Sequence, residues 1–374
     1  MNAALFRSVL CAGFVSIAVA GSASAGGFAR GTADTDILYE DGNFAMRTGI
    51  TYVSPTRKYS EFDAAPGLVG TNYTDDYVIP SAAVKINVTD DLRCAGTLVD
   101  NNGGTVSFAV PKPSGKIKED FTTNEKAVTC GVRFQAGPGY AWVLGGGFVE
   151  DFKYNREDFV AAPVPHATLN LSGQDYGWRA GLAYEIPEIA LRGQVLYRSG
   201  TSYGATGTLR VPVAPGVTMP FDATGTGNLP QSVEVKLQSG IAPGWLGFGS
   251  VKWTDWSVQK ELLVNSLVKN TADIYNWKDG WTVTGGIGHA FNETVSGALS
   301  LTWDQGVGTG WDLSSDTYTL AAGGVIRDKL GGELRGGLGV SYLTSAQETK
   351  YGPLNSAVDN GWAFAVNLGY KVNW

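Results

Sequence analysis

The last thirteen residues of the chain alternate strictly between large apolar and small or polar side chains. Such alternation is typical of a β-strand, because successive side chains of a strand point to opposite faces. Thirteen residues exceed the usual strand length of a soluble protein, whereas a tilted strand that crosses a bilayer needs about 9–11 residues with aromatic rings at both ends. The stretch therefore favours a membrane-spanning strand over the last strand of a soluble barrel. Its apolar face consists of Trp362, Phe364, Val366, Leu368, Tyr370, Val372 and Trp374.

The first 25 residues have the three-part pattern of a secretory signal peptide. Arg7 precedes an apolar run from Val9 to Ala20, and Ala23-Ser24-Ala25 stands directly before Gly26. A run of this length is too short to span a bilayer, which argues against a membrane anchor. We expect cleavage after Ala25 and export of the mature chain.

The rest of the chain is organised as strand-like segments rather than helices. No run approaches the roughly eighteen apolar residues of a transmembrane helix, and alternation with flanking turn residues marks fourteen segments. They cover approximately 43–54, 76–88, 92–100, 124–136, 140–154, 174–186, 189–209, 229–241, 244–257, 278–291, 294–304, 315–326, 332–345 and 359–373. Short turns alternate with long connections, as in bacterial outer-membrane barrels, which have even strand numbers. The sequence thus predicts an all-β, fourteen-stranded antiparallel transmembrane barrel over residues 43–374.

The net charge and the cysteine content indicate which partners and which cellular compartment fit the chain. The formal net charge of −7 argues against nucleic acid as a partner. Cys11 lies in the signal peptide, which leaves Cys94 and Cys130 in the mature chain. Both fall on strands that we expect to be neighbours, and an oxidising compartment permits a disulfide between them. Two free buried thiols are the alternative, because the sequence does not give the register.

Four stretches resemble the FadL family of outer-membrane transporters for long-chain fatty acids and other hydrophobic compounds. They are YGWRAGLAYEIPEIALRGQVLYRSG (176–200), LPQSVEVKLQSGIAPGWLGFGSVKWTDWS (229–257), NWKDGWTVTGGIGHAF (276–291) and SDTYTLAAGGV (315–325). The resemblance runs from about Asn43 to Trp374. It implies a fourteen-stranded barrel in the outer membrane of a Gram-negative bacterium. It also implies an N-terminal plug in the lumen and a kink in the third strand that opens the wall to the membrane.

Two features of the sequence bear on the plug and on the kink. Only residues 26–42 precede the first strand, and Asn43-Phe44-Ala45 stands where family members carry Asn-Pro-Ala, so the plug is short and the family's inner ligand pocket is in question. Residues 100–104 read Asp-Asn-Asn-Gly-Gly, which breaks a strand ladder readily. They correspond either to the kink or to an ordinary loop.

Two predicted long loops, 155–173 and 210–228, are unusually apolar for exposed connections. An exposed apolar patch generally marks a binding site, although the same side chains can pack together and cap the barrel. The apolar candidates for ligand binding are Phe159, Val160, Val164, Leu169, Val211, Val213, Val217, Met219 and Phe221. Lys153, Arg156 and Arg210 flank them and are candidates to orient a ligand carboxylate. Arg179, Arg192 and Arg335 are expected in the lumen, where barrels hold ion networks.

The sequence gives no support for catalysis. His166 and His289 are the only two histidines, and neither a Gly-x-Ser-x-Gly elbow nor a metal-ligand cluster is present. We therefore expect no catalytic residue, no metal and no cofactor.

The pattern instead favours passive uptake of fatty-acid-like hydrophobic molecules. The alternative is a general diffusion porin with a water-filled lumen. The expected surroundings are the lipid bilayer and lipopolysaccharide, and the barrel is expected to be a monomer. Trp374 at the C-terminus resembles the signal read by the barrel-assembly machinery, although most family members end in Phe.

Overall fold

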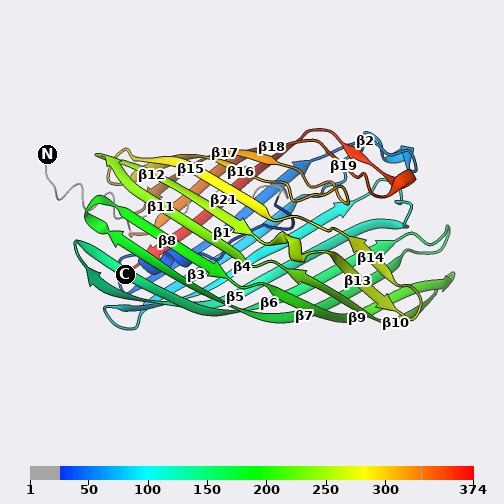
Figure 1. Ribbon diagram of the computed structural model, residues 1–374, viewed down its shortest axis with the longest axis horizontal. Helices are drawn as coiled ribbons and strands as arrows, with labels where there is room; N and C mark the ends of the chain where they lie inside the picture. The colour runs from blue at the N-terminus through cyan, green and yellow to red at the C-terminus, as the bar shows by residue number, and fades with distance from the viewer. Residues whose placement is uncertain (1–25, 330) are drawn as a thin grey trace.

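The computed structural model of the protein describes residues 26–329 and 331–374. The predicted signal peptide, residues 1–25, lies outside the described residues. Strands wind into one elongated barrel (Figure 1). The strands are β1 (Phe44–Thr56), β2 (Tyr59–Glu61), β3 (Tyr77–Asn87), β4 (Leu92–Ser107), β5 (Lys116–Ala136), β6 (Gly139–Asp158), β7 (Ala167–Ile186), β8 (Leu191–Arg198), β9 (Thr201–Ala214), β10 (Val217–Leu229), β11 (Ser232–Ala242), β12 (Trp245–Thr254), β13 (Glu261–Ser266), β14 (Thr271–Ile274), β15 (Gly280–Ala290), β16 (Val295–Asp304), β17 (Thr317–Arg327), β18 (Glu333–Leu343), β19 (Ala346–Gln347), β20 (Ala357–Val358) and β21 (Gly361–Asn373).

Helical structure in the described residues is limited to short 3-10 turns. They are η1 (Thr35–Tyr39), η2 (Pro66–Leu68), η3 (Pro187–Ile189), η4 (Trp256–Val258) and η5 (Gly352–Leu354). None of the helices in the described part of the chain is long and apolar enough to cross a membrane.

The wall of the barrel has fourteen crossings, as predicted. Eighteen strands form the main sheet, and four crossings each contain two consecutive strands separated by a short break, namely β8 with β9, β10 with β11, β12 with β13 and β14 with β15. All neighbouring crossings pair antiparallel, and β1 pairs with both β3 and β21, which closes the barrel. A small separate sheet of β2, β19 and β20 lies in the connections.

All the connections at one end are short, whereas the long connections lie at the other end, which orients the barrel. Tight connections join β3 to β4, β5 to β6, β7 to β8, β11 to β12, β15 to β16 and β17 to β18. The amide of Phe44 donates to the carbonyl of Trp374 at 2.8 Å, so β1 starts and β21 ends at the same end as these tight turns. In outer-membrane barrels that end is periplasmic.

Several strands run further toward the extracellular end than the sequence predicted. The predicted loop 210–228 is a regular hairpin of β9 and β10 with a turn at its tip, and only residues 159–166 of the predicted loop 155–173 lie outside β6 and β7. The predicted boundaries were wrong because these strands continue beyond the membrane, where their outward residues are polar.

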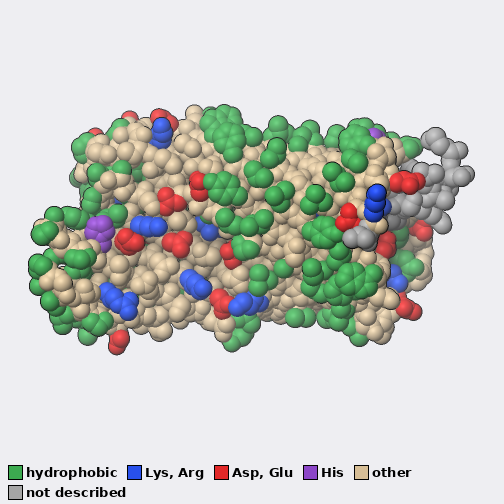
Figure 2. Space-filling model, turned by 180° about the vertical axis from the view of Figure 1, so that it is seen from behind, with side chains coloured by type: hydrophobic (Ala, Val, Ile, Leu, Met, Phe, Trp, Pro, Cys, Tyr) green, Lys and Arg blue, Asp and Glu red, His purple; other side chains and the backbone are tan. Residues whose placement is uncertain are grey.

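The two faces of the strands follow the predicted alternation. On β21, Phe364 is 57% exposed, whereas Ala363 and Lys371 are 2% and 1% exposed and point into the barrel. Phe44 stacks on Trp374 with ring centroids 4.5 Å apart, which places aromatic rings at the periplasmic rim. Figure 2 shows green apolar side chains spread over the outer wall. The apolar outer face is the surface that lipid covers.

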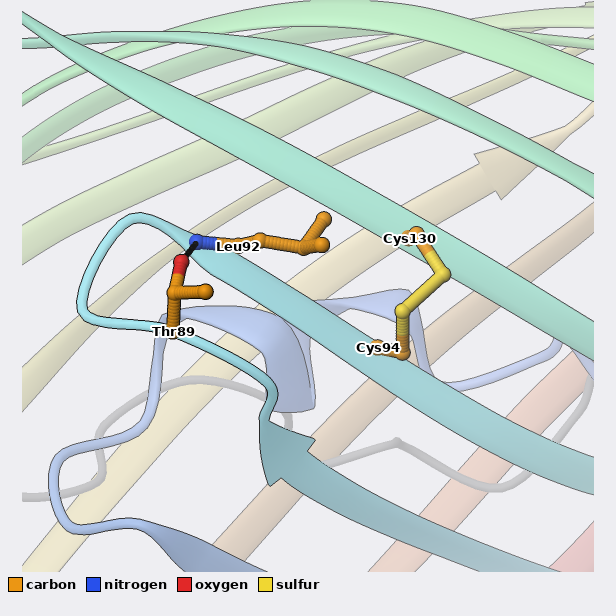
Figure 3. Close-up of a disulfide and its surroundings, with 4 residues drawn as sticks. All are labelled: Thr89, Leu92, Cys94 and Cys130. Atoms are coloured by element: carbon orange, nitrogen blue, oxygen red, sulfur yellow. Dashed lines mark hydrogen bonds between the residues drawn. A yellow bond between two sulfur atoms is a disulfide. The ribbon is translucent and has the colours of Figure 1, made fainter.

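A disulfide joins Cys94 to Cys130 on the outer face (Figure 3). The two residues lie directly opposite each other on β4 and β5. Their side chains point away from the lumen, because the neighbouring Arg93 and Ala95 are buried inside it. Figure 3 also shows the adjoining turn, where the amide of Leu92 donates to Oγ1 of Thr89 at 3.0 Å.

Residues 26–42, called here the N-terminal segment, lie within the barrel (Figure 1). Charged groups attach the segment to two separate parts of the wall, the adjoining strands β1 and β21 and, away from them, β11. Asp34 pairs with Arg47 of β1 at 2.7 Å, Asp36 with Lys236 of β11 at 3.0 Å, and Glu40 with Lys371 of β21 at 2.7 Å. The segment is therefore held across the lumen rather than along one strand.

Candidate functional site

The ladder between β3 and β4 ends partway up the barrel wall. The two strands pair from Asn87 with Arg93 up to Ser81 with Val99. Beyond that point β3 continues along β1 to Tyr77, while β4 continues along β5 to Ser107. Residues 77–80 and 100–104 therefore face each other without pairing, and the strands meet again only at the bridge between Thr74 and Val106. We call this interruption the gap.

The residues at the gap explain why the ladder ends. The register between β4 and β5 shifts between Asp100 and Asn102, which is a β-bulge at Asn101. The side chains of Asn101 and Asn102 are buried, and the Nδ2 atom of each donates to the carboxylate of Glu150 inside the barrel. On the opposite side Pro80 has no N–H to donate. The ladder-breaking residues singled out in the sequence thus form a kink in the third crossing strand.

The N-terminal segment pairs with the edge of β4 that the kink leaves free. The amide of Arg30 donates to the carbonyl of Asn101 at 2.9 Å, and the amide of Gly103 donates to the carbonyl of Phe28 at 2.8 Å. Gly31 lies at the closest approach, because an added Cβ would stand 2.5 Å from Val99 and 3.1 Å from Ile79. Residues 28–31 therefore occupy the gap between the two strands.

The side chain of Arg30 connects the two sides of the gap. Its guanidinium lies 4.1 Å from the centre of the Tyr77 ring on β3. It also donates to Oγ1 of Thr105 on β4 at 3.1 Å. A cation over an aromatic face is attracted by the ring, so Arg30 holds the segment to both strands.

Phe28 belongs to a group of aromatic residues that fills the extracellular part of the lumen. Its ring centroid lies 4.8 Å from those of Phe121 and Trp277, 5.4 Å from Tyr275 and 6.2 Å from Trp256. We call these five residues the aromatic cluster. Trp256 and Trp277 come from the breaks between β12 and β13 and between β14 and β15, which turn these rings inward.

A cavity of about 430 Å³ lies on the periplasmic side of the aromatic cluster. Residues 29–34 of the N-terminal segment form part of its lining. Ile79, Val99 and Phe248 give it apolar surface, whereas Lys252 and Thr302 on the other strands give it charge and hydroxyl groups. This lumen cavity can accommodate a molecule that has both an apolar and a polar part.

Two carboxylates of the N-terminal segment are held in their charged form. Burial alone would raise the pKa of Asp36. The positive charges of Lys236 and Arg192 outweigh this effect and lower the pKa to about 2. The pKa of Glu40 is likewise about 2, because Arg47 and Lys371 outweigh the effect of burial. Both groups are therefore ionised at neutral pH and can anchor the segment electrostatically.

The structure does not bring the predicted apolar site residues to the lumen cavity. Phe159, Val160 and Val164 lie in the connection between β6 and β7, and Leu169 is buried on β7 in the apolar group around Phe152. The remaining five candidates lie on strands rather than in a loop. They are Val211 and Val213 on β9, and Met219 and Phe221 on β10, where Val217 begins the strand.

The three predicted basic residues do not share one site. Arg156 points inward and pairs with Asp158 at 2.8 Å. Lys153 and Arg210 are exposed on the outer face. Lys153 alternates along β6 with the buried Phe152 and Tyr154. Arg210 lies opposite Pro220 on the exposed hairpin of β9 and β10. Strand parity separates these residues.

The three arginines expected in the lumen do face inward. Arg179 is buried against Glu125, Arg192 donates to Gln238 at 3.1 Å, and Arg335 pairs with Glu333 at 3.3 Å. Arg192 and Arg335 also line the lumen cavity.

Comparison with known proteins addresses which family shares this arrangement. A model of the outer membrane protein transport protein family (OMPP1/FadL/TodX) matches residues 159–297. A long-chain fatty acid transport protein of Salmonella typhi is 23% identical over 387 aligned residues, which cover 92% of this chain and 85% of the relative. The chain is therefore similar to the FadL/TodX proteins of the outer membrane. It is a Gram-negative outer-membrane protein.

Solved structures share the fold of this barrel. A Pseudomonas aeruginosa FadL homologue superposes with a TM-score of 0.69 at 11% identity, covering 90% of this chain and 91% of that chain. The Pseudomonas putida toluene transporter TodX superposes with a TM-score of 0.65 at 13% identity, covering 95% of this chain and 96% of that chain. The Ralstonia pickettii toluene transporter TbuX superposes with a TM-score of 0.65 at 12% identity, covering 97% of this chain and 98% of that chain.

Proposed function

We propose that this protein is a passive outer-membrane channel for hydrophobic small molecules, with long-chain fatty acids as its main substrates. The observation that carries the proposal is the gap between β3 and β4 beside an occupied lumen. A general diffusion porin needs a continuous water-filled lumen. Here the aromatic cluster and the N-terminal segment fill the lumen, while the wall is interrupted at the level of apolar outward residues such as Val78 and Leu98.

The route begins at the extracellular end. Val160, Val213 and Met219 are exposed there and offer apolar surface to a ligand. A ligand then reaches the aromatic cluster, whose rings bind apolar and aromatic molecules alike. From there it enters the lumen cavity and leaves through the gap when residues 28–31 move away from β4.

Residues 26–42 act in this proposal as a short plug, and residues 43–374 as the barrel that it closes. The anchors at Asp34, Asp36 and Glu40 support this role, since they attach the segment across the lumen. Release of the ligand requires no energy source, because each step is binding and diffusion.

Relatives with printed substrates support both a fatty acid and an aromatic ligand. The Salmonella typhi relative is a long-chain fatty acid transport protein, and TodX and TbuX are toluene transporters. The family consists of transport proteins, and we propose no enzymatic activity for this member.

The surroundings of the barrel are also part of the proposal. The outward positions of Lys153 and Arg210 support contact with lipopolysaccharide. The exposed Trp374 at the end of β21 supports recognition by the barrel-assembly machinery. We propose that the barrel works as a monomer.

The direct test is uptake by intact cells of a Gram-negative strain that lacks its own fatty-acid transporter. Cells that make this protein should take up a labelled long-chain fatty acid faster than control cells. Proteoliposomes with the purified barrel should at the same time stay impermeable to a small hydrophilic sugar. Sugar entry that depends on molecular size, without faster fatty-acid uptake, would identify a porin instead. Competition by toluene measures whether aromatic compounds share the route.

A further inference from the structure

The outer face of the barrel carries a groove that crosses β3 to β7. The groove has a volume of about 700 Å³, and one of its sides is a row of outward residues that are register partners on consecutive strands. Neighbouring strands are about 4.8 Å apart, so a row across five strands extends roughly 19 Å. The row consists of Ala82, Leu98, Lys126, Val149 and Tyr176. We call this feature the outer groove.

Glycines form the floor of the outer groove. In the next row toward the periplasm, Gly96 and Gly147 alternate with Val84 and Val128. A Cβ added at Gly96 would meet no atom within 4 Å, and one at Gly147 would first meet the carbonyl of Gly177 at 3.7 Å. Packing therefore does not require glycine at either position. The missing side chains instead give the lipid-facing wall its hollow shape.

The outer groove begins directly below the gap. Ala82 and Leu98 line it and are register partners. These residues belong to the last paired positions of β3 and β4 below the gap, since the ladder ends at Ser81 and Val99. A molecule that passes through the wall at the gap therefore reaches the outer groove without crossing another ridge of side chains.

The lining of the outer groove is mostly apolar, and Lys126 is its charged residue. The Lys126 side chain is 54% exposed and pairs with Asp151, which also accepts a hydrogen bond from Gln174 at 2.7 Å. An ammonium group has three donors, so Lys126 can bind a second anion while it keeps its contact with Asp151. This combination suits an aliphatic chain with one anionic end.

We propose that the outer groove is an exit site, which holds the aliphatic chain of the transported ligand after the chain has passed the gap, with its carboxylate at Lys126. This inference rests on the proposed function, because it takes the ligand leaving through the wall as the occupant. The position of the outer groove directly below the end of the β3–β4 ladder favours that occupant over a lipid of the bilayer.

The test uses the mature full-length protein in nanodiscs with a long-chain fatty acid that carries a photoreactive diazirine. The double substitution Gly96→Leu with Gly147→Leu fills the outer groove. Gly285→Leu is the matched control, because Gly285 is an outward glycine on β15 whose Cβ would also meet nothing within 4 Å. Heat-modifiable migration on gels verifies that each variant is folded.

We expect the label to map to β4–β6 in the wild type and in the Gly285→Leu variant. In the groove-filled variant, labelling and cellular uptake should both fall about tenfold. This corresponds to a loss of about 1.4 kcal/mol in binding free energy. Lys126→Gln should reduce labelling by the fatty acid but not by the corresponding fatty alcohol.

Normal uptake and labelling in the groove-filled variant would overturn the exit site and leave the proposed function intact. The exit site would also be wrong if phospholipid competed for the label as well as free fatty acid did while uptake stayed normal. A wild-type protein that takes up no fatty acid would overturn the proposed function and the exit site together.

Discussion

The backbone amide of Arg30 donates a hydrogen bond of 2.9 Å to the carbonyl of Asn101, the residue at which β4 bulges. This bond satisfies a carbonyl that β3 leaves unpaired, because the ladder between β3 and β4 has already ended at Ser81. The kink of β4 thus frees the backbone carbonyl to which the N-terminal segment docks. Movement of the segment would expose the β4 edge and open the wall.

Gly31 limits how closely the segment can approach β4. In Gly31→Val, the new side chain would meet Val99 at 2.5 Å and the carbonyl of Asp100 at 2.8 Å, so the segment must leave the gap. We expect higher permeability to a small sugar in proteoliposomes. Thr32→Val is the control, because Thr32 is exposed in the same segment. Equal permeability in the two variants would mean that the segment does not close the barrel.

Phe28 contributes its ring to the aromatic cluster. Phe28→Ala removes four ring contacts, at a cost of about 2 kcal/mol or more to docking, since each such pair contributes about 0.5–1.5 kcal/mol. Fatty-acid uptake should become faster, because less displacement is needed, and single-channel recordings should show more frequent opening. Slower uptake with unchanged opening would show that Phe28 contributes more to binding the ligand than to obstructing its path.

The anchors of the N-terminal segment give docking a defined dependence on pH. The pKa values of Asp36 and Glu40 are both about 2, against ordinary values of 3.8 and 4.5. A carboxylate with a lowered pKa stabilises the docked state above its ordinary pKa, and this contribution is lost as the pH falls toward the lowered value. Sugar permeability should therefore stay constant from about pH 8 to about pH 5 and rise below about pH 4. A rise already between pH 7 and pH 5 would require another titrating group.

The disulfide fixes β4 to β5 near the periplasmic turn between β3 and β4, below the gap. Removing a disulfide typically costs about 2–4 kcal/mol of stability. The double substitution Cys94→Ser with Cys130→Ser should therefore lower the temperature at which the barrel unfolds on gels, while uptake persists. Loss of uptake at a temperature where the barrel stays folded would show that the bond also keeps the gap in its working shape.

The period-two pattern was sufficient to predict the crossings and their faces. Phe364 and Ala363 lie outside and inside as their alternation indicated, and the same reasoning applied to Phe152 would have placed Lys153 on the outer wall. The candidate site was predicted less well, because apolar residues such as Val211 and Phe221 were assigned to loops when they continue long strands.

The lumen residues were missed for a different reason. Phe28 meets Trp256 and Trp277 from more than two hundred residues away in the chain, and no local pattern encodes such a contact. Trp256 and Trp277 also lie where strands break, so strand parity does not indicate which way they point. Only the ladder-breaking residues 100–104 gave a local signal for the gap.

The most direct test locks residue 29 to β4 with a reversible bond. Ala29→Cys and Asn102→Cys place two thiols on residues that form an antiparallel bridge. The pair is introduced together with Cys94→Ser and Cys130→Ser, so that only the new bond responds to reductant. Fatty-acid uptake is then measured in cells before and after reduction. The account predicts uptake at the level of cells without the protein when the bond is formed, and recovery when it is reduced. Equal uptake in both states would contradict exit through the gap.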